Sequence, residues 1–102
     1  MITRIFYIVL FLLISTIGWN QSQSQYISAG EKSMEEGDFY GASIYFGEAM
    51  LYDSTDLDLI FKYAESFRLH NNYEKAEYYY NKIYYKDGGR EYKKAVFWLA
   101  SM

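Results

Sequence analysis

The feature that most constrains this chain is an internal repeat with a 34-residue period. When the segment 36–49 is aligned with the segment 70–83, residues of the same character coincide. The matching pairs are Phe39 with Tyr73, Ala42 with Ala76, Phe46 with Tyr80, Ala49 with Ile83 and, further along, Asp53 with Asp87. Periods of about 20 to 50 residues are typical of proteins in which one small unit is stacked on copies of itself. We therefore expect a short stack of similar units.

Within each unit the pattern predicts two helices joined by a tight turn. Apolar residues recur at spacings of three and four, which places them on one helix face. The pairs 37–38 and 71–72 stand at the turns, since Gly and Asn tolerate the left-handed backbone that ends a helix. Small residues mark close approaches between helices, and they are Ala29, Gly30, Ala42, Ala64 and Ala76. We expect an all-α fold with helices over 25–36, 40–52, 57–70, 73–86 and 92–102.

A 34-residue period with these small and aromatic positions resembles the tetratricopeptide repeat (TPR) family. The resemblance divides the chain into a first unit over 23–56, a second over 57–90 and a partial third over 91–102. Val96, Leu99 and Ala100 resemble the start of that third unit, displaced by two residues by the pair 88–89. The resemblance implies a TPR-type helix-turn-helix solenoid of about two and a half repeats over residues 25–102.

The resemblance also implies a binding groove on the concave side of the solenoid, lined by the first helix of each unit. Carried over by position, the groove residues are Ile27, Glu31, Met34, Glu35, Asp58, Phe61, Glu65, Arg68 and Leu69. Their spacing of three or four residues places them on one helix face. We expect this groove to hold an extended or helical peptide, with the acids favouring a basic ligand. The alternative is that it packs against other domains of the same chain.

Residues 1–24 have the composition of a secretory signal peptide. A short positive segment precedes an apolar run over 5–14, and small and polar residues follow up to Ser24. Cleavage after Ser24 leaves Gln25 first, and cleavage after Gly18 is the other candidate. A retained membrane anchor is the alternative, although the apolar stretch is shorter than the roughly 20 residues that span a bilayer. We expect an exported protein of the periplasm or cell envelope, with a possible association with the outer membrane.

Charge and cysteine content exclude several other classes. The chain has 10 Lys and Arg against 13 Asp and Glu, which is not the basic excess of a nucleic-acid binder. It contains no Cys, so neither disulfides, a lipid-anchoring cysteine nor a thiolate metal site is expected. The tyrosines of 78–80 and 84–85 resemble a stacking surface for bases, but we expect them to fill the space between helices.

No residue pattern supports catalysis. His70 is the one His of the chain and stands at a predicted helix end, where capping or exposure explains it. The pairs 35–36 and Asp56 with Asp58 imitate catalytic carboxylates, but acids are commoner at helix starts and on exposed faces. The segment 88–90 lacks the Lys-Ser/Thr of a phosphate-binding loop. We expect a non-enzymatic protein with no cofactor, metal, small-molecule substrate or nucleic-acid partner.

Four short segments, at 36–40, 62–69, 72–78 and 95–99, follow the apolar N-terminus. In the sequence of these segments the chain is similar to the start of periplasmic TPR proteins of type IX secretion and gliding motility. There the repeats precede a β-propeller and a peptidoglycan-binding OmpA-like domain. The similarity implies a protein–protein interaction scaffold in such a complex.

Two alternatives remain open for the function. One is a generic periplasmic or membrane-anchored TPR adaptor. The other is the accessory region of a larger protein whose catalytic domain lies beyond Met102. The segment 95–100 is apolar on nearly every side, unlike the polar cap that closes a repeat array, and this favours a truncated chain.

Overall fold

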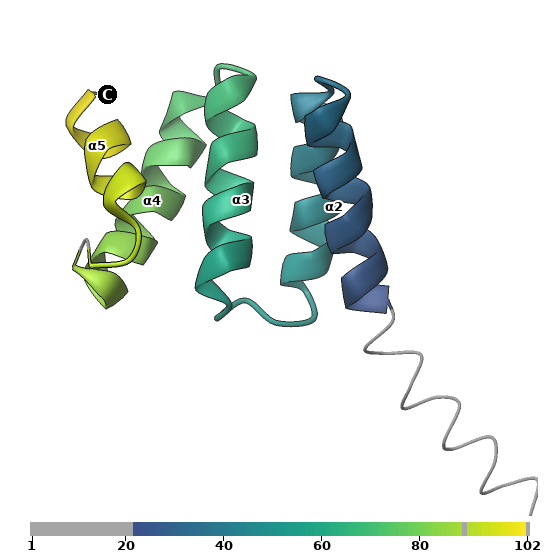
Figure 1. Cartoon of the computed structure of the whole chain (residues 1–102), viewed down its shortest axis with the longest axis horizontal. Helices are drawn as coiled ribbons and strands as arrows, with labels where there is room; N and C mark the ends of the chain where they lie inside the picture. The colour runs from purple at the N-terminus through teal and green to yellow at the C-terminus, as the bar shows by residue number, and fades with distance from the viewer. Residues whose placement is uncertain (1–21, 89, 102) are drawn as a thin grey trace, which may run out of the picture.

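Helices that run back and forth along one axis make up the computed structural model, which describes residues 22–88 and 90–101 (Figure 1). Within this part the fold is all-α, with five packed antiparallel helices, each in contact with the next, and no sheet. The helices are 22–35, α2 Phe39–Met50, α3 Leu57–Leu69, α4 Tyr73–Asp87 and α5 Lys93–Ser101. Each predicted helix is confirmed, with ends that differ by three residues or fewer.

The predicted signal peptide lies almost wholly outside the described residues. Of the segment 1–24, only residues 22–24 are described, and they form the beginning of the first helix. None of the helices in the described part is long and apolar enough to cross a membrane.

The five helices form two layers (Figure 1). The helix 22–35, α3 and α5 make the layer nearer the viewer, and α2 and α4 lie behind it. We call the outer surface of the nearer layer the three-helix face. Residues from the first helix of each predicted unit therefore share one side of the molecule.

The turn between paired helices has the same geometry in both predicted units. Gly37 has a φ of 79° and Asn71 a φ of 68°, so both predicted turn residues adopt the left-handed conformation. Asp38 caps α2 by accepting a hydrogen bond from the Gly41 N–H, and Asn72 caps α4 in the same way. Equivalent positions of the two units thus have the same role, one as the left-handed turn residue and the next as the cap of the following helix.

The remaining turns are also fixed by acidic side chains. The sequence offers three residues that could cap α3, namely Ser54, Thr55 and Asp56. The cap is Asp56, whose carboxylate accepts hydrogen bonds from the Asp58 and Leu59 N–H groups. Gly88 ends α4 with a φ of 64°, as the sequence leads one to expect. The Asp87 carboxylate then accepts hydrogen bonds from two backbone N–H groups of the loop before α5.

The core lies between the two layers and is built from repeat-equivalent residues. Phe46, Ala49, Tyr80 and Ile83 are all fully buried, which confirms the face predicted for the second helix of each unit. The predicted small residues Ala42, Ala64 and Ala76 are also fully buried, and Gly30 is buried, whereas Ala29 is only half-buried. A close approach of the layers therefore rests on these small side chains.

The three residues of α5 that resemble the start of a third unit are not all buried. Ala95 is fully buried, Trp98 and Leu99 are half-buried, and Val96 and Ala100 are exposed. Of the three, only Leu99 packs against the core, so α5 is not oriented as the resemblance implies. The small Ala95 allows α5 to approach the core, and the large Trp98 indole covers the adjoining part of it.

The prediction that the clustered tyrosines all fill the core is also wrong. Tyr80 is fully buried and Tyr79 is half-buried against the core. Tyr78, Tyr84 and Tyr85 are 55%, 43% and 82% exposed. In a helix, three consecutive residues point in directions about 100° apart, so one face of α4 cannot bury the whole run.

Candidate functional site

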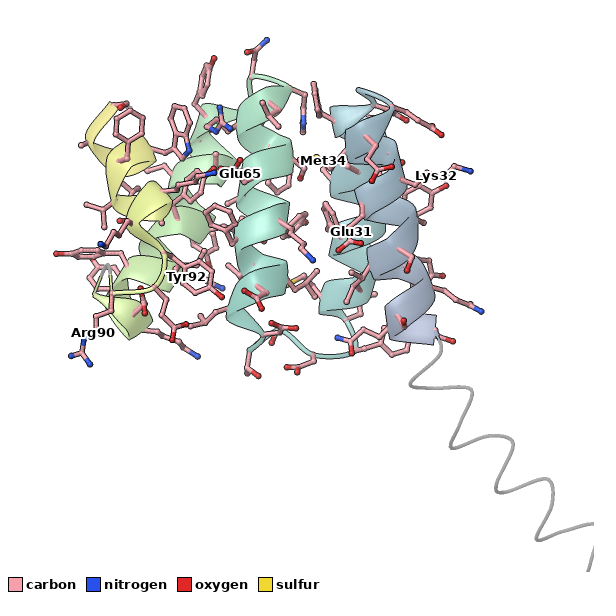
Figure 2. All side chains as sticks on the ribbon, viewed as in Figure 1. Glu31, Lys32, Met34, Glu65, Arg90 and Tyr92 are labelled. Atoms are coloured by element: carbon pink, nitrogen blue, oxygen red, sulfur yellow. The ribbon has the colours of Figure 1, made fainter. Side chains whose placement is uncertain are left out.

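A hollow of about 260 Å³ lies between the helix 22–35 and α3. Its lining residues are Glu31, Met34, Phe46, Phe61, Lys62 and Glu65. Figure 2 shows Glu31 and Met34 where the first helix faces α3, and it shows Glu65 on the edge of α3 nearer α5. We call this hollow the inter-unit hollow. Four of the nine predicted groove residues line it, namely Glu31, Met34, Phe61 and Glu65.

The structure does not bring the other five predicted groove residues into the inter-unit hollow. Ile27 is half-buried and packs against the core of α2. Glu35 is exposed, and Leu69 is half-buried at the end of α3. Asp58 accepts a hydrogen bond from the Tyr92 hydroxyl, which ties the start of α3 to the residue before α5. Arg68 lines a different hollow near Trp98.

The acids of the inter-unit hollow have intramolecular partners. Glu31 forms an ion pair with Lys62 across the two helices, with an N···O distance of 2.5 Å. Glu65 pairs with the Arg68 guanidinium at 3.0 Å and accepts a hydrogen bond from the Tyr80 hydroxyl. Each carboxylate is therefore at least partly neutralised before any ligand arrives. The structure gives this hollow less preference for a basic ligand than the sequence pattern predicts.

Tyr80 holds the Glu65 side chain in place from the core. Burial, together with the neighbouring Glu65 carboxylate, raises the pKa of Tyr80 well above its usual range. The hydroxyl therefore stays protonated and remains a donor to Glu65 at all ordinary pH values. Arg68 donates to the same hydroxyl at 3.4 Å, so the three side chains form one connected cluster.

A larger hollow, of about 430 Å³, lies where α3 ends, α4 begins and α5 ends. Its lining residues are Arg68, Tyr73, Glu74, Glu77, Trp98 and Ser101. We call it the end hollow. Sequence reasoning found only Arg68 among these residues. The signal that it missed is the spacing of Glu74 and Glu77, because neither has a Lys or Arg three or four residues later on α4.

The residues that imitate a catalytic site have structural roles or lie exposed. His70 caps the end of α3, as predicted, and its Nδ1 lies 2.6 Å from the Ser66 carbonyl oxygen. Asp56 caps α3, and Glu35 and Glu36 are exposed. Within residues 22–88 and 90–101, no group of three or more His, Asp or Glu side chains is placed to hold a metal ion.

These features define the class that the described part supports, a short array of antiparallel helices with surface hollows at the junctions between helices. Comparison with protein-family models, with curated proteins and with solved structures finds no match.

Proposed function

We propose that this chain is an exported, non-enzymatic protein–protein interaction scaffold of the TPR type, acting in the periplasm or cell envelope. The narrower proposal is a role in a type IX secretion or gliding-motility complex, which rests on the sequence resemblance alone. The partner is a protein or peptide that lies against the three-helix face.

The repeat type is supported by hydrogen bonds that recur with the period of the sequence. The Asp38 N–H donates to the Ser33 carbonyl at 2.8 Å, and at the equivalent turn of the second unit the Asn72 N–H donates to the Phe67 carbonyl at 2.8 Å. The neighbouring bonds of the two turns, from residues 37 and 71, both measure 3.1 Å. Stacking of repeat-equivalent units is the arrangement in which a solenoid builds a continuous surface.

The observation that carries the functional proposal is that Glu31 and Glu65 line the same hollow. One full period separates them, so they occupy the same position in successive units. Met34 and Phe61 add apolar surface between them, and Phe46, which also lines the hollow, is fully buried. A hollow with an apolar centre and charged edges, lined by the same position of two successive units, suits contact with a protein segment better than chemistry on a small substrate.

A charge reversal at the edge of the hollow tests this proposal. Lys62→Glu places two like charges beside each other at Glu31, whereas Lys32→Glu makes the same change on a side chain that points away from the hollow (Figure 2). The tagged full-length chain is used to capture partners from the envelope of its native cells, and the recovered proteins are quantified by mass spectrometry. Circular dichroism checks that both variants keep their helices.

We expect Lys62→Glu to lower recovery of the partner by about tenfold, because the change breaks the Lys62–Glu31 ion pair and leaves uncompensated acids at the edge of the hollow, which removes the charge pattern to which the partner is complementary. Lys32→Glu should leave recovery unchanged. Equal recovery with both variants would place the partner elsewhere on the molecule. Recovery of no protein by the parent chain would contradict the scaffold proposal itself.

A further inference from the structure

The exposed large apolar side chains of this protein lie away from the three-helix layer's first two members. Within the described residues they belong to α2, to the turn that follows it, to α4 and to α5, and none belongs to the helix 22–35 or to α3. α2 and α4 form the second layer of the molecule (Figure 1). Exposed apolar patches commonly mark interaction sites, so the outer surface of this second layer is a candidate interface.

The apolar residues of the second layer form two rows that repeat with the period of the sequence. Ile44 and Leu51, at the middle and the C-terminal cap of α2, are 51% and 80% exposed. Tyr78 and Tyr85 of α4 follow them by one full period and are 55% and 82% exposed. A separation of seven residues places both members of each pair on one helix face. We call these rows the α2 stripe and the α4 stripe.

Each stripe carries one charged residue between its two apolar residues, and the two charges have opposite signs. Glu48 lies on the α2 stripe, and Lys82 occupies the equivalent position of the α4 stripe, 34 residues later. Both side chains are exposed, and within residues 22–88 and 90–101 neither forms an ion pair. The Lys82 ammonium lies 4.8 Å from the centroid of the Tyr78 ring, which keeps the cation on the stripe without neutralising it.

We propose that this chain forms a two-fold dimer in which the α2 stripe of each copy lies against the α4 stripe of the other. The stripes complement each other in charge and in the spacing of their apolar residues, so the surface that matches one of them is present on the same molecule. The Glu48 carboxylate of each copy pairs with the Lys82 ammonium of the second copy. Apolar side chains above and below this pair shield it from water.

The direction of the helices allows this arrangement. Consecutive helices are antiparallel, so α2 and α4 run in the same direction. A two-fold axis parallel to them keeps that direction and sets equivalent positions of the two stripes at corresponding heights. Glu48 then faces Lys82 of the second copy, and the apolar residues of one stripe face those of the other. Such an interface is self-complementary, and the symmetry matches the distance between α2 and α4 to itself.

The apolar area of the stripes fits a weak dimer. At about 200 Å² for a fully exposed large side chain, the four apolar residues expose roughly 500 Å² in each copy. Their burial in both copies would remove about 1,000 Å² from water, which is near the lower limit for a specific interface. The chain should therefore be a monomer in dilute solution and dimerise as its concentration rises.

The dimer goes beyond the proposed contact with a partner and uses the opposite layer. It leaves the three-helix face of each copy on the outside, so one assembly presents two partner surfaces. A partner that itself has two binding sites would then be held more tightly than by a single copy.

Charge reversal within the dimer tests the proposal by sedimentation velocity on the protein purified from its native cells. Glu48→Lys and Lys82→Glu each set like charges against each other at both symmetry-related contacts. In an equimolar mixture of these two variants, opposite charges meet again at both contacts. The matched controls are Glu36→Lys and Lys32→Glu, which make the same changes of charge at exposed positions outside the stripes. Circular dichroism checks that each variant keeps its helices.

We expect the parent chain to shift from monomer to dimer with rising concentration. Each single variant should dimerise about tenfold more weakly, the mixture should recover the dimer to within about twofold of the parent, and both controls should behave as the parent does. A monomer at every concentration would overturn the proposal. A dimer that persists in both single variants, that the mixture does not restore or that the controls weaken equally would also overturn it.

Partner capture separates this inference from the proposed function. Lys62→Glu alters the inter-unit hollow and should leave the dimer unchanged, whereas Glu48→Lys should still recover a partner from the three-helix face. A parent chain that recovers its partner and never dimerises would leave the scaffold proposal standing and overturn the dimer. A chain that dimerises as described and recovers no other protein would give the reverse result.

Discussion

Single small residues set how closely the two layers of this protein approach. A Cβ placed on Gly30 would lie 2.5 Å from the Cε1 atom of the Phe46 ring. The equivalent pair in the second unit is Ala64 with Tyr80, both fully buried. The first unit therefore needs glycine at a position where the second accepts alanine.

Gly30→Ala should lower the stability of the fold. The better helix propensity of alanine favours the variant by up to about 1 kcal/mol, but overpacking of a ring typically costs about 1–3 kcal/mol. We expect a net loss of about 1 kcal/mol, measured by urea unfolding followed by circular dichroism. The double variant Gly30→Ala/Phe46→Leu should recover part of this loss. A single variant more stable than the parent would refute the close contact.

Tyr63 should make the fold sensitive to alkaline pH. Burial, followed by its contact with Tyr79, raises the pKa of Tyr63 to about 12, against about 10 in the unfolded chain. The unfolded chain therefore loses this proton first, so stability is fully present below pH 10 and falls between pH 10 and 12.

Melting temperatures recorded from pH 9 to 12 test this titration. Tyr63→Phe should reduce the fall in stability, and Tyr85→Phe should not, because Tyr85 is 82% exposed. Some decline should persist in Tyr63→Phe, since the pKa values of Tyr80 and Tyr92 are also raised. Identical slopes for Tyr63→Phe and the parent would show that Tyr63 is not the group responsible.

The ion pair between two helices is the part of the candidate site that sequence reasoning could not predict. The spacing of Glu31 and Glu65 placed them on one face correctly, because a 34-residue period and helical geometry suffice for that. Glu65 and Arg68 stand three residues apart on α3, and helical spacing alone brings them together. Glu31 and Lys62 lie on different helices, so their pairing depends on how those helices pack.

Three helices of the array, α2, α3 and α4, begin after a residue whose side chain caps them. α3 starts after Asp56, whose side chain accepts the Asp58 N–H at 3.0 Å. Asp56→Ala should cost about 1 kcal/mol of stability, since it leaves backbone donors of the first turn without this acceptor. Asp56→Asn should retain most of the stability in thermal unfolding, and equal losses for the two variants would argue against capping.

If the chain is exported as proposed, its first helix bears on where the signal peptide is cut. The described part of this helix starts at residue 22, and the Gln23 side-chain amide donates to the Ala49 carbonyl at 3.4 Å. Cleavage after Ser24 would remove that contact, whereas cleavage after Gly18 would retain it. We therefore expect N-terminal sequencing of the exported protein to begin at Trp19. A sequence that begins at Gln25 would show that the Gln23 contact is dispensable.

Helix α5 shows where a repeat pattern stops being predictive. The positions of α2, α3 and α4 follow from residues that recur from unit to unit, so their inward faces could be predicted. α5 follows the pair 88–89, which has no counterpart in the earlier unit. The face that α5 turns toward the core is set by the packing of Ala95 and Trp98 on α3 and α4. Such tertiary contacts cannot be inferred from the repeat pattern.

At the scale of the whole molecule, an acidic half and a more basic half are held together by contacts between them. Residues 25–58 carry eight acids and one base, and residues 59–102 carry five acids and eight bases. Glu31 with Lys62 and Asp58 with Tyr92 join the two halves. Surface pairs of this kind contribute little to stability, so the uneven charge belongs chiefly to the solvated surface, and steering of a partner by it is a part of the functional proposal.

Site-specific photo-crosslinking in the native cells tests the central claim, that a protein partner lies on the three-helix face. A benzoylphenylalanine replaces Glu35, exposed on the helix 22–35, and in a matched variant it replaces Glu48, exposed on α2 in the other layer. We expect a defined protein, other than a second copy of the chain, to crosslink at position 35 and little or none of it at position 48. Crosslinks confined to position 48, or the absence of any protein crosslink at either position, would contradict the account.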